Sequence, residues 1–180
     1  MARYAMVMDT RKCIGCHSCT VACKVRNELP TEMIYNPVTT DGPHGTFPNL
    51  NMRFLPLICM HCDNSPCVDA CPTGASIQEE NGIVHVEDKK CVGCLSCIMA
   101  CPYGARYHNH DTGAVNKCNF CLDRVEEGML PHCVETCHQH ARIFGDLDDE
   151  NSEVSKLISE NQAFQLLPEL NTDPCVFYIY

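Results

Sequence analysis

Sixteen of the 17 cysteines in this 180-residue chain fall into four groups of four. The first and third groups, CIGCHSCTVAC and CVGCLSCIMAC, separate their cysteines by two, two and three residues, the spacing of bacterial runs whose thiolates bind 4Fe-4S clusters. The second and fourth groups keep the outer gaps and lengthen the middle one. In chain order the groups are Cys13, Cys16, Cys19 and Cys23; Cys59, Cys62, Cys67 and Cys71; Cys91, Cys94, Cys97 and Cys101; and Cys118, Cys121, Cys133 and Cys137.

The spacing also predicts that the groups work in pairs. Three cysteines on a tight loop can each reach a different iron of one cubane, but the fourth follows the start of a helix and is carried toward a neighbouring cluster. Pro72 and Pro102 come directly after the fourth cysteine of their groups and end that turn. His138 stands in this place after Cys137, which indicates a more relaxed turn there.

Zinc ligation and disulfide bonding fit this pattern less well. Structural zinc sites usually join two separated C-x2-C pairs, whereas here three cysteines fall within seven residues in two separate places. Disulfide scaffolds are favoured in small secreted chains, but the spacing of two, two and three serves no disulfide purpose. Iron–sulfur ligation is therefore the best interpretation of the sixteen cysteines.

Haem attachment and a catalytic site are further alternatives. Cys13 to His17 matches the C-x-x-C-H haem motif, but haem would remove two cysteines from a four-cysteine run. The matching third group has no histidine at the corresponding place. No nucleophile beside a base, phosphate loop or recognisable pair of carboxylates is evident, so the sequence predicts a chain without a catalytic site of its own.

Other residues that could act on the clusters lie around the cysteine loops. Because all sixteen cysteine positions are filled, histidine is expected to donate hydrogen bonds near the clusters rather than to bind iron. The histidines concerned are His17, His61, His108, His110, His132, His138 and His140. Lysines beside the loops either raise the cluster potentials or are ordinary surface charges; these are Lys12, Lys24, Lys89, Lys90 and Lys117. Cys175 stands outside the groups and is expected to be a packed structural thiol.

The segments between the cysteine groups predict short strands and hairpins. The phrase C-P-x-G-A follows both Cys71 and Cys101, and the alanine recurs after Cys137, so the groups are copies of one unit. Apolar residues around Asn81-Gly82 predict a hairpin, and Gly113 predicts a second turn. A strand over residues 4–8 leads into the first group. The predicted fold class is α+β, with each unit made of a strand, a cluster loop, a short helix and a strand.

Two segments depart from this unit. Residues 29–57 carry five prolines and predict a long excursion, either a surface loop or a segment that faces a partner. In the C-terminal part, Asn151 or Ser152 is expected to cap a helix with Val154, Leu157 and Ile158 on one face. The stretch PCVFYIY then predicts a strand.

Charge and hydropathy limit the possible partners. The formal net charge is −10, and thiolate-bound clusters would add roughly two negative charges each, so nucleic acid is not expected as a partner. No stretch approaches the roughly 18 apolar residues of a membrane span. The first residues show neither a secretory apolar region nor a twin arginine, so the chain is not expected to export or anchor itself.

Taken with these groups, several phrases resemble the four-cluster iron–sulfur subunits of membrane-bound molybdopterin oxidoreductases in the dimethyl sulfoxide reductase superfamily. They are YAMVMDTRKCIGC, GTFPN, KCNFC, PHCVETC and FGDLDD, and they span nearly the whole chain. Polysulfide and thiosulfate reductase subunits look closest. The resemblance implies two nested ferredoxin-like modules: residues 1–52 with 108–147, the inserted residues 53–107, and a C-terminal extension over 148–180.

The resemblance also implies which cysteines share a cluster. Cluster one would use Cys13, Cys16, Cys19 and Cys137; cluster two Cys118, Cys121, Cys133 and Cys23; cluster three Cys59, Cys62, Cys67 and Cys101; and cluster four Cys91, Cys94, Cys97 and Cys71. Relatives that replace the second cysteine of the third group hold a three-iron cluster, but that residue is Cys94 here. Four 4Fe-4S clusters are therefore expected.

The implied function is electron transfer between a molybdopterin catalytic subunit and a membrane quinone-interacting or cytochrome subunit in anaerobic respiration. The implied location is the periplasmic face of the cytoplasmic membrane, reached by export together with the catalytic subunit, with the cytoplasmic face as the alternative. A polyferredoxin-type carrier for a hydrogenase or formate dehydrogenase shares the same cofactors. A zinc-stabilised binding module is the more distant alternative.

Overall fold

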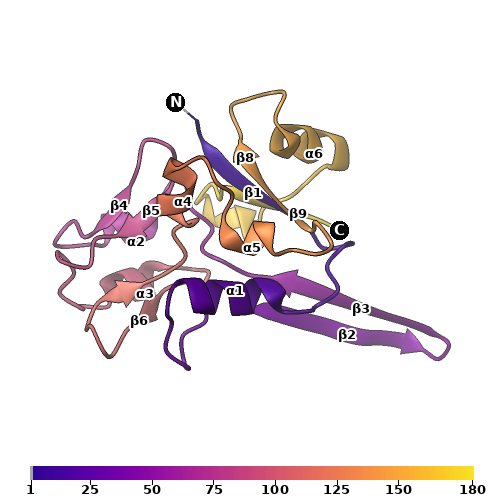
Figure 1. Ribbon diagram of the computed structural model, residues 1–180, viewed down its shortest axis with the longest axis horizontal. Helices are drawn as coiled ribbons and strands as arrows, with labels where there is room; N and C mark the ends of the chain where they lie inside the picture. Colours follow the sequence, from indigo (N-terminus) through magenta and orange to yellow (C-terminus); the bar gives the residue numbers. More distant parts are fainter. Residues whose placement is uncertain (1) are drawn as a thin grey trace.

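The fold is organised around a three-stranded sheet whose middle strand is the first in the chain (Figure 1). In the computed structural model, which describes residues 2–180, β1 (Tyr4–Asp9) lies between β8 (Arg142–Asp146) and β9 (Val176–Ile179). β8 runs antiparallel to β1, and β9 runs parallel to it. The strand predicted over residues 4–8 is thereby confirmed, and its two partners come from the far end of the chain.

Both faces of this sheet are buried, because β1 is apolar at successive positions. Met6 and Met8 point into one core and Ala5 and Val7 into another, and all four are 0% exposed. The first core includes Tyr178 and lies toward the cysteine loops. The opening YAMVM is therefore a central strand covered on both sides.

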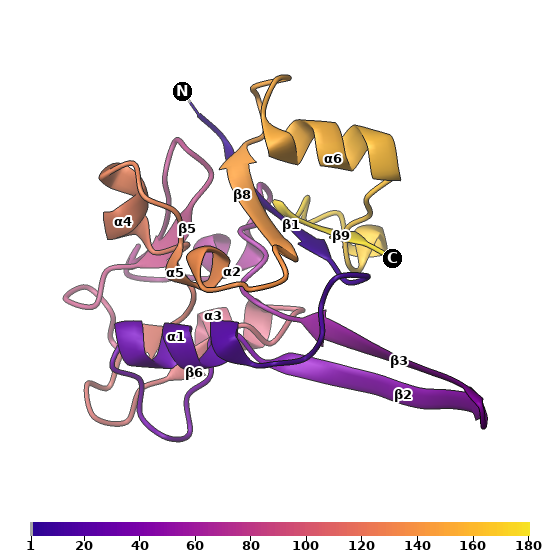
Figure 2. The same cartoon turned by 45° about the vertical axis from the view of Figure 1, so that its right-hand side comes forward.

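The helix α6 (Glu153–Asn161) covers the second face (Figure 2). Its N-cap is Ser152, whose Oγ accepts a hydrogen bond from the backbone N–H of Ser155 at 3.1 Å. Val154 is fully buried, and Leu157 and Ile158 pack against the same core. The predicted cap and apolar face of this helix are confirmed, with Ser152 rather than Asn151 as the cap.

Five other helices carry or follow the cysteine groups. They are α1 (Ser18–Arg26), α2 (Pro66–Asp69), α3 (Ser96–Ala100), α4 (Leu122–Glu126) and α5 (His132–Glu135). α1 packs against α5, and α2 packs against α3. The first group thus lies beside the fourth, and the second beside the third.

Two small hairpins join the groups. β4 (Ser76–Gln78) pairs with β5 (Val84–Val86) around the Asn81-Gly82 turn, as predicted. β6 (Tyr107–His108) pairs with β7 (Val115–Asn116) across the turn that contains Gly113, also as predicted. Each hairpin ends a few residues before the next cysteine group.

The proline-rich excursion is a two-stranded ribbon that projects from the body of the molecule (Figures 1 and 2). β2 (Val38–Thr46) pairs with β3 (Asn49–Pro56), so the predicted excursion over residues 29–57 is present, and most of it is a pair of hydrogen-bonded strands rather than a loop. Prolines usually interrupt strands, but Pro43 lies at a shift in register and Pro48 in the turn. A proline is tolerated in such places because no ladder hydrogen bond is lost.

The last part of the chain connects the sheet to the second cysteine group. The short 3-10 helix η1 (Pro168–Leu170) precedes a segment whose backbone pairs with residues 60–64, for example from Cys175 N–H to the Met60 carbonyl at 2.9 Å. The predicted C-terminal strand is confirmed as β9, and it belongs to the central sheet. None of the helices formed by residues 2–180 has the length and apolar character needed to cross a membrane.

Candidate metal centres

Four cavities of similar size are each lined by four cysteine side chains. Their empty volumes, which include space open to solvent, are about 390, 360, 310 and 310 Å³. In this order the lining cysteines are Cys13, Cys16, Cys19 and Cys137; Cys23, Cys118, Cys121 and Cys133; Cys59, Cys62, Cys67 and Cys101; and Cys71, Cys91, Cys94 and Cys97. Each of the sixteen cysteines therefore lies at one cavity, and every cavity takes three cysteines from one group and one from another.

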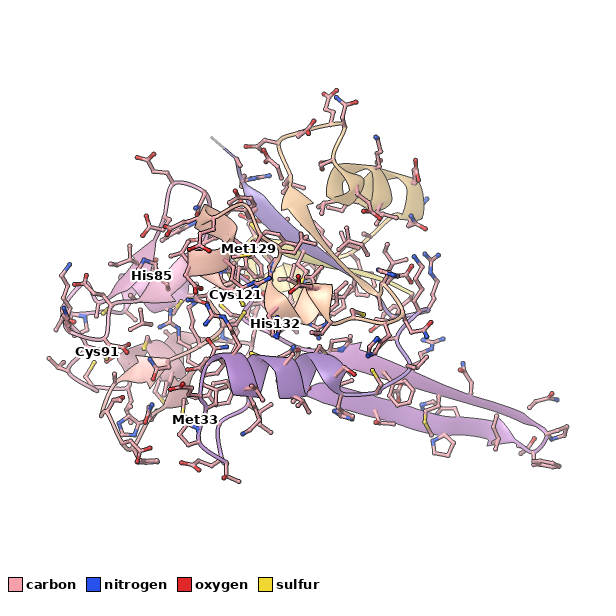
Figure 3. All side chains as sticks on the ribbon, viewed as in Figure 1. Met33, His85, Cys91, Cys121, Met129 and His132 are labelled. Atoms are coloured by element: carbon pink, nitrogen blue, oxygen red, sulfur yellow. The ribbon has the colours of Figure 1, made fainter. Side chains whose placement is uncertain are left out.

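The third cysteine has the same position on a short helix in every group, and this explains why the fourth cysteine lines a different cavity. In all four groups the third cysteine is the second residue of a short helix. The fourth cysteine follows four residues later, which is about one helical turn and roughly 5–6 Å further along the axis. Cys23 is still within α1, whereas Cys71, Cys101 and Cys137 lie just beyond the ends of their helices, so the fourth cysteine is too far along to face the same cavity as the third. Figure 3 shows Cys91 near one edge of the molecule and Cys121 closer to its centre.

Backbone N–H groups point at several of the sulfur atoms. Ser76 N–H donates to Cys71 Sγ at 3.4 Å, and Ala141 N–H donates to Cys137 Sγ at 3.3 Å. A third N–H, from Val115, donates to Cys91 Sγ at 3.4 Å. Hydrogen bonds of this kind stabilise a thiolate over a thiol and tune a metal that the thiolate binds.

Burial and hydrogen bonding shift the pKa values of these thiols in opposite directions. Burial raises the pKa of Cys23 to about 12, and the nearby thiols of Cys133 and Cys121 add to this effect. At Cys71 burial also opposes ionisation, but donors from Ser76 and Thr73 outweigh it and lower the pKa to about 7. Four converging thiols whose pKa values are raised, as that of Cys23 is, can all ionise only beside strong positive charge.

The donor set fits a multi-iron cluster better than a single ion. Within residues 2–180, no three side chains of histidine, cysteine, aspartate or glutamate converge closely enough to hold one metal ion. The sulfur atoms instead surround a space, which suits a cubane whose corners are reached from separate directions. None of the seventeen cysteines, all of which lie within the described residues, forms a disulfide bond.

Two buried arginines at these cavities were missed by sequence reasoning. Arg106 and Arg142 are 4% and 3% exposed, although arginine is rarely buried. Arg106 Nη2 donates to Cys67 Sγ at 2.8 Å, and Arg142 lines the cavity of Cys13. Each follows the repeated alanine after a fourth cysteine. The arginine shared by the phrases GAR and HAR could therefore have identified this pair in the sequence.

The lysines beside the loops have different surroundings. Lys117 is 5% exposed, and its Nζ donates to the carbonyls of Val84 and Cys118. Lys24 Nζ donates to three carbonyls of the segment that leads to the ribbon. Lys12 and Lys90 form ion pairs with nearby carboxylates, and Lys89 is exposed. Only Lys117 in this set is a buried charge.

The histidines are spread over several environments. His61 is fully buried, its Nδ1 accepts a hydrogen bond from the Val84 N–H at 3.0 Å, and burial holds its pKa well below the usual value. His17 lines the cavity of Cys13, and the rings of His108 and His110 meet edge to face. His132 lies beside a glutamate at the start of α5.

Cys175 lines none of the four cysteine cavities. It is 1% exposed, and its Sγ donates to Asp63 Oδ1 at 3.3 Å. Burial raises its pKa, and the Asp63 carboxylate raises it further. The expectation of a packed thiol is confirmed.

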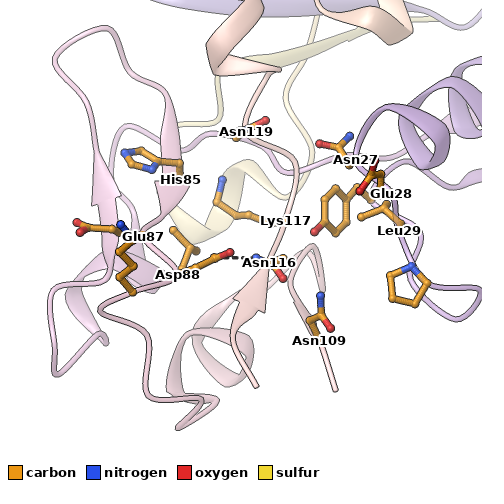
Figure 4. Close-up of a pocket in the computed structure, with 14 residues that line it drawn as sticks. Asn27, Glu28, Leu29, His85, Glu87, Asp88, Asn109, Asn116, Lys117 and Asn119 are labelled. Carbon is orange, nitrogen blue, oxygen red and sulfur yellow. Dashed lines mark hydrogen bonds between the residues drawn. The ribbon is translucent and has the colours of Figure 1, made fainter. Parts of the chain in front are cut away.

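A larger, polar cavity lies between α1 and the β4–β5 hairpin (Figure 4). It encloses about 1240 Å³, partly open to solvent, and none of its lining residues is a cysteine. Lys117, Asn119, Asn27 and Asp88 are among the side chains around it, and Asp88 accepts a hydrogen bond from Asn116 at 2.9 Å. Within residues 2–180, no three histidine, cysteine or carboxylate side chains converge closely enough to hold a metal ion, and those that line this cavity are no exception.

Comparison with known proteins gives consistent matches along the chain. The family described as "4Fe-4S dicluster domain" matches residues 50–147, and a second family of the same description matches residues 12–75. A tetrathionate reductase subunit of Salmonella typhimurium is 45% identical over 98% of this chain and 72% of its own. A selenate reductase subunit of Mesobacillus selenatarsenatis is 40% identical over 98% and 72%. A thiosulfate reductase electron transfer subunit of Salmonella typhi is 42% identical over 91% and 85%.

Proposed function

Because the chain belongs to the 4Fe-4S dicluster iron–sulfur subunits of the dimethyl sulfoxide reductase family of enzymes, we propose that it relays single electrons through four 4Fe-4S clusters. The chain is the electron-transfer subunit of a molybdoenzyme reductase complex in anaerobic respiration, and it is not the catalytic subunit. The observation that carries the cluster count is the set of four cavities, each lined by four cysteines.

The same cavities support the assignment of ligands to each cluster. Cluster one is held by Cys13, Cys16, Cys19 and Cys137, cluster two by Cys118, Cys121, Cys133 and Cys23, cluster three by Cys59, Cys62, Cys67 and Cys101, and cluster four by Cys91, Cys94, Cys97 and Cys71. Residues 1–52 and 108–147 then form an outer module with clusters one and two, and residues 53–107 form an inserted module with clusters three and four. The packing of α1 on α5 and of α2 on α3 supports this division.

Shared or touching side chains support a line of sites in the order one, two, three, four. Arg142 lies at the cavity of cluster one and beside Cys133 of cluster two. The ring of His61, next to Cys62 of cluster three, stacks on Phe120, next to Cys121 of cluster two. Arg106 lines the cavities of both cluster three and cluster four. Adjacent sites are therefore linked by shared or touching side chains.

The two ends of this line are the most open of the sites. Cys16 of cluster one and Cys94 of cluster four are exposed, while the other cysteines are buried or half-buried. Apolar Ile14 and Val92 are exposed on the same loops. We assign the cluster-one end to the molybdopterin subunit and the cluster-four end to a quinone-interacting membrane subunit or a cytochrome.

The protein's own contribution is to hold, insulate and tune the sites. A bound 4Fe-4S cluster takes up and returns one electron at a time. The tight loops and helices fix the thiolates, and the apolar residues of the core keep water away from the inner sites. N–H donors such as those of Ser76 and Ala141 stabilise the negative charge on sulfur, which favours the reduced state.

We place the complex at the periplasmic face of the cytoplasmic membrane, where the chain arrives together with its catalytic subunit. The relatives belong to reductases of tetrathionate, selenate and thiosulfate, which supports a partner of this enzyme class. Fractionation of cells with the intact operon tests the placement. Folded chain on the periplasmic side of the cytoplasmic membrane supports this placement, and folded chain in the cytoplasm alone contradicts it.

Chemical analysis tests the cluster count directly. The purified complex should contain, on this chain, about sixteen iron and sixteen acid-labile sulfide atoms, in addition to those of the catalytic subunit. A chain purified without its partner gives the same number. About four zinc ions and little sulfide would overturn the proposal. A stable redox-active chain that never copurifies with a molybdopterin protein would favour a free polyferredoxin carrier instead.

A further inference from the structure

Two buried arginines occupy the same place in two copies of the repeat. Arg106 is the fifth residue after Cys101, and Arg142 is the fifth residue after Cys137. Both lie in the sequence alanine-arginine, and both are less than 5% exposed. A buried guanidinium is costly unless negative charge lies close by.

Arg106 lies between the sites of clusters three and four. Its Nη2 donates to Cys67 Sγ at 2.8 Å and to Ser76 Oγ at 2.6 Å. The same side chain lines the cavity of Cys59 and the cavity of Cys91. Its Nε and Nη1 are buried without a hydrogen-bond partner in the protein. Two N–H donors of Arg106 are therefore available to clusters bound at these two sites.

Arg142 has the corresponding place in the outer module. It lines the cavity of Cys13, and its Nη2 donates to Asn36 Oδ1 at 2.6 Å. Burial lowers its pKa, but the thiols of Cys133 and Cys19 outweigh that effect and raise it. Cys19 belongs to cluster one and Cys133 to cluster two. Its Nη1 is also buried and without a partner.

Neither arginine has a carboxylate partner. Among the residues that the structure describes, no aspartate or glutamate oxygen lies within 4.0 Å of either guanidinium. The negative charge that justifies their burial must therefore come from the thiolates and from what they bind. Cluster sites with four thiolates supply such charge, and they supply it on both sides of each arginine.

We propose that Arg106 and Arg142 are bridging cations, one in each module, that raise the reduction potentials of the two clusters beside them. The inference rests on the four-cluster function proposed above. Reduction adds one negative charge to a cluster, and a fixed positive charge nearby stabilises that added charge strongly in a medium of low dielectric constant. Each arginine therefore acts on two clusters and leaves the pair in the other module largely unaffected.

The bridging place suits transfer between the two neighbours. When one electron passes along the pair, one cluster is oxidised by one electron and the other is reduced by one, so the total charge around the arginine is unchanged. A cation beside both clusters stabilises the electron before and after the step. A cation beside only one of them would hold the electron there. Arginine suits this role because its planar guanidinium presents donors in several directions and stays protonated.

Redox titration of the purified complex, followed by electron paramagnetic resonance, tests the proposal. In Arg106→Met the potentials of clusters three and four should fall while those of clusters one and two stay in place. In Arg142→Met the shifts should occur in clusters one and two instead. Lys89→Met, which removes an exposed charge two residues before Cys91, is the control and should shift no potential comparably.

Iron and sulfide analysis of every variant separates this proposal from the function itself. A wild-type chain without four clusters removes the proposed function, whatever the variants do. A fully loaded Met variant whose potentials match the wild type overturns the bridging role. If a Met variant loses clusters, Arg→Lys and Arg→Gln at the same position decide the matter. If lysine restores the cluster content but glutamine does not, the positive charge is required. If the two variants restore the clusters equally, or both fail to, the arginine has a packing role and the proposal is overturned.

Discussion

His61 and Phe120 stack on each other with their ring centroids 3.6 Å apart and their planes inclined by 19°. His61 lies within the second cysteine group and Phe120 within the fourth, so the contact joins residues of the two proposed modules. Both side chains are almost completely buried. The stack therefore forms part of the packing between the sites of clusters two and three, where electrons would cross from one module to the other.

Removal of this ring should loosen the contact between the modules. His61→Ala leaves a cavity and deprives the Val84 N–H of its acceptor, so we expect a loss of about 3–5 kcal/mol in the free energy of unfolding. Thermal unfolding of the cluster-loaded chain measures this loss. His44→Ala, on the exposed ribbon, is the matched control and should have little effect. Equal melting temperatures for the two variants would contradict the role given to the stack.

The loop of the third group tolerates only glycine at position 93. Gly93 has φ of +64°, and a Cβ atom there would lie 2.4 Å from the carbonyl oxygen of Gly113. Gly74 has nearly the same φ, +66°, but open space around it. Gly74→Ala should therefore cost only the strain of the left-handed backbone, about 1 kcal/mol, whereas Gly93→Ala should displace the loop.

Iron content and melting temperature distinguish the two glycine variants. Gly74→Ala should keep the full iron content with a small decrease in melting temperature. Gly93→Ala should lose up to a quarter of the iron, because its loop carries three of the four cysteines assigned to cluster four. Full loading of the Gly93 variant, with a melting temperature equal to that of the Gly74 variant, would show that the backbone contact is not needed.

Cys175 and Cys97 should respond differently to the same substitution. Cys175→Ala removes a buried thiol that touches Asp63 but no cluster cavity, so all iron should remain and stability should fall by about 1–2 kcal/mol. Cys97→Ala removes a proposed ligand and should lower the iron content by about a quarter. Metal analysis after purification under reducing, anaerobic conditions gives both numbers. Iron loss in the Cys175 variant would assign that residue to a cluster.

The carboxylate of Asp9 gives the strand β1 a pH-dependent anchor. Hydrogen bonds from Arg11, at 2.8 and 2.9 Å, lower the pKa of Asp9 against the opposing effect of burial. A lowered pKa in the folded state stabilises the protein above the usual pKa of aspartate, and this stabilisation is lost as the pH falls through the lowered value. Asp9→Asn should therefore melt at a lower temperature than the wild type at pH 7.

The difference between these two chains should shrink as the pH falls below about 4, where Asp9 is protonated in the unfolded wild type. Melting curves of both chains at a series of pH values measure it, and acid loss of clusters affects the two chains alike. A difference that grows toward acid pH would contradict the lowered pKa.

Local patterns in the sequence were sufficient to predict the elements close to the cysteines. The hairpin around Asn81 and Gly82 depends on a turn that those two residues favour, and the cap at Ser152 depends on one side-chain oxygen. The assignment of cysteines to clusters stays a prediction, although the cavities group them in the predicted sets.

Interactions between distant parts of the chain could not be predicted in this way. The parallel pairing of β9 with β1 joins the two ends of the described chain, and no local pattern specifies it. Arg106 and Arg142 look like ordinary surface residues until the neighbouring thiols are placed around them. The ribbon was missed because Pro43 and Pro48 are signals against a strand, and only the register of β2 with β3 shows that both fall outside the hydrogen-bonded ladder.

The nested arrangement of the cysteines sets the order in which the cavities can be completed during synthesis. During synthesis, all eight cysteines that line the two cavities of the inserted module have left the ribosome once Cys101 has emerged. The cavity of Cys13 has to wait for Cys137, and β1 has to wait still longer for β9. The middle of the chain can therefore mature first, while the thiols made earliest remain open to oxidation and to the wrong metal. Protection of these first thiols until the last strand arrives is a task for the cell's assembly machinery.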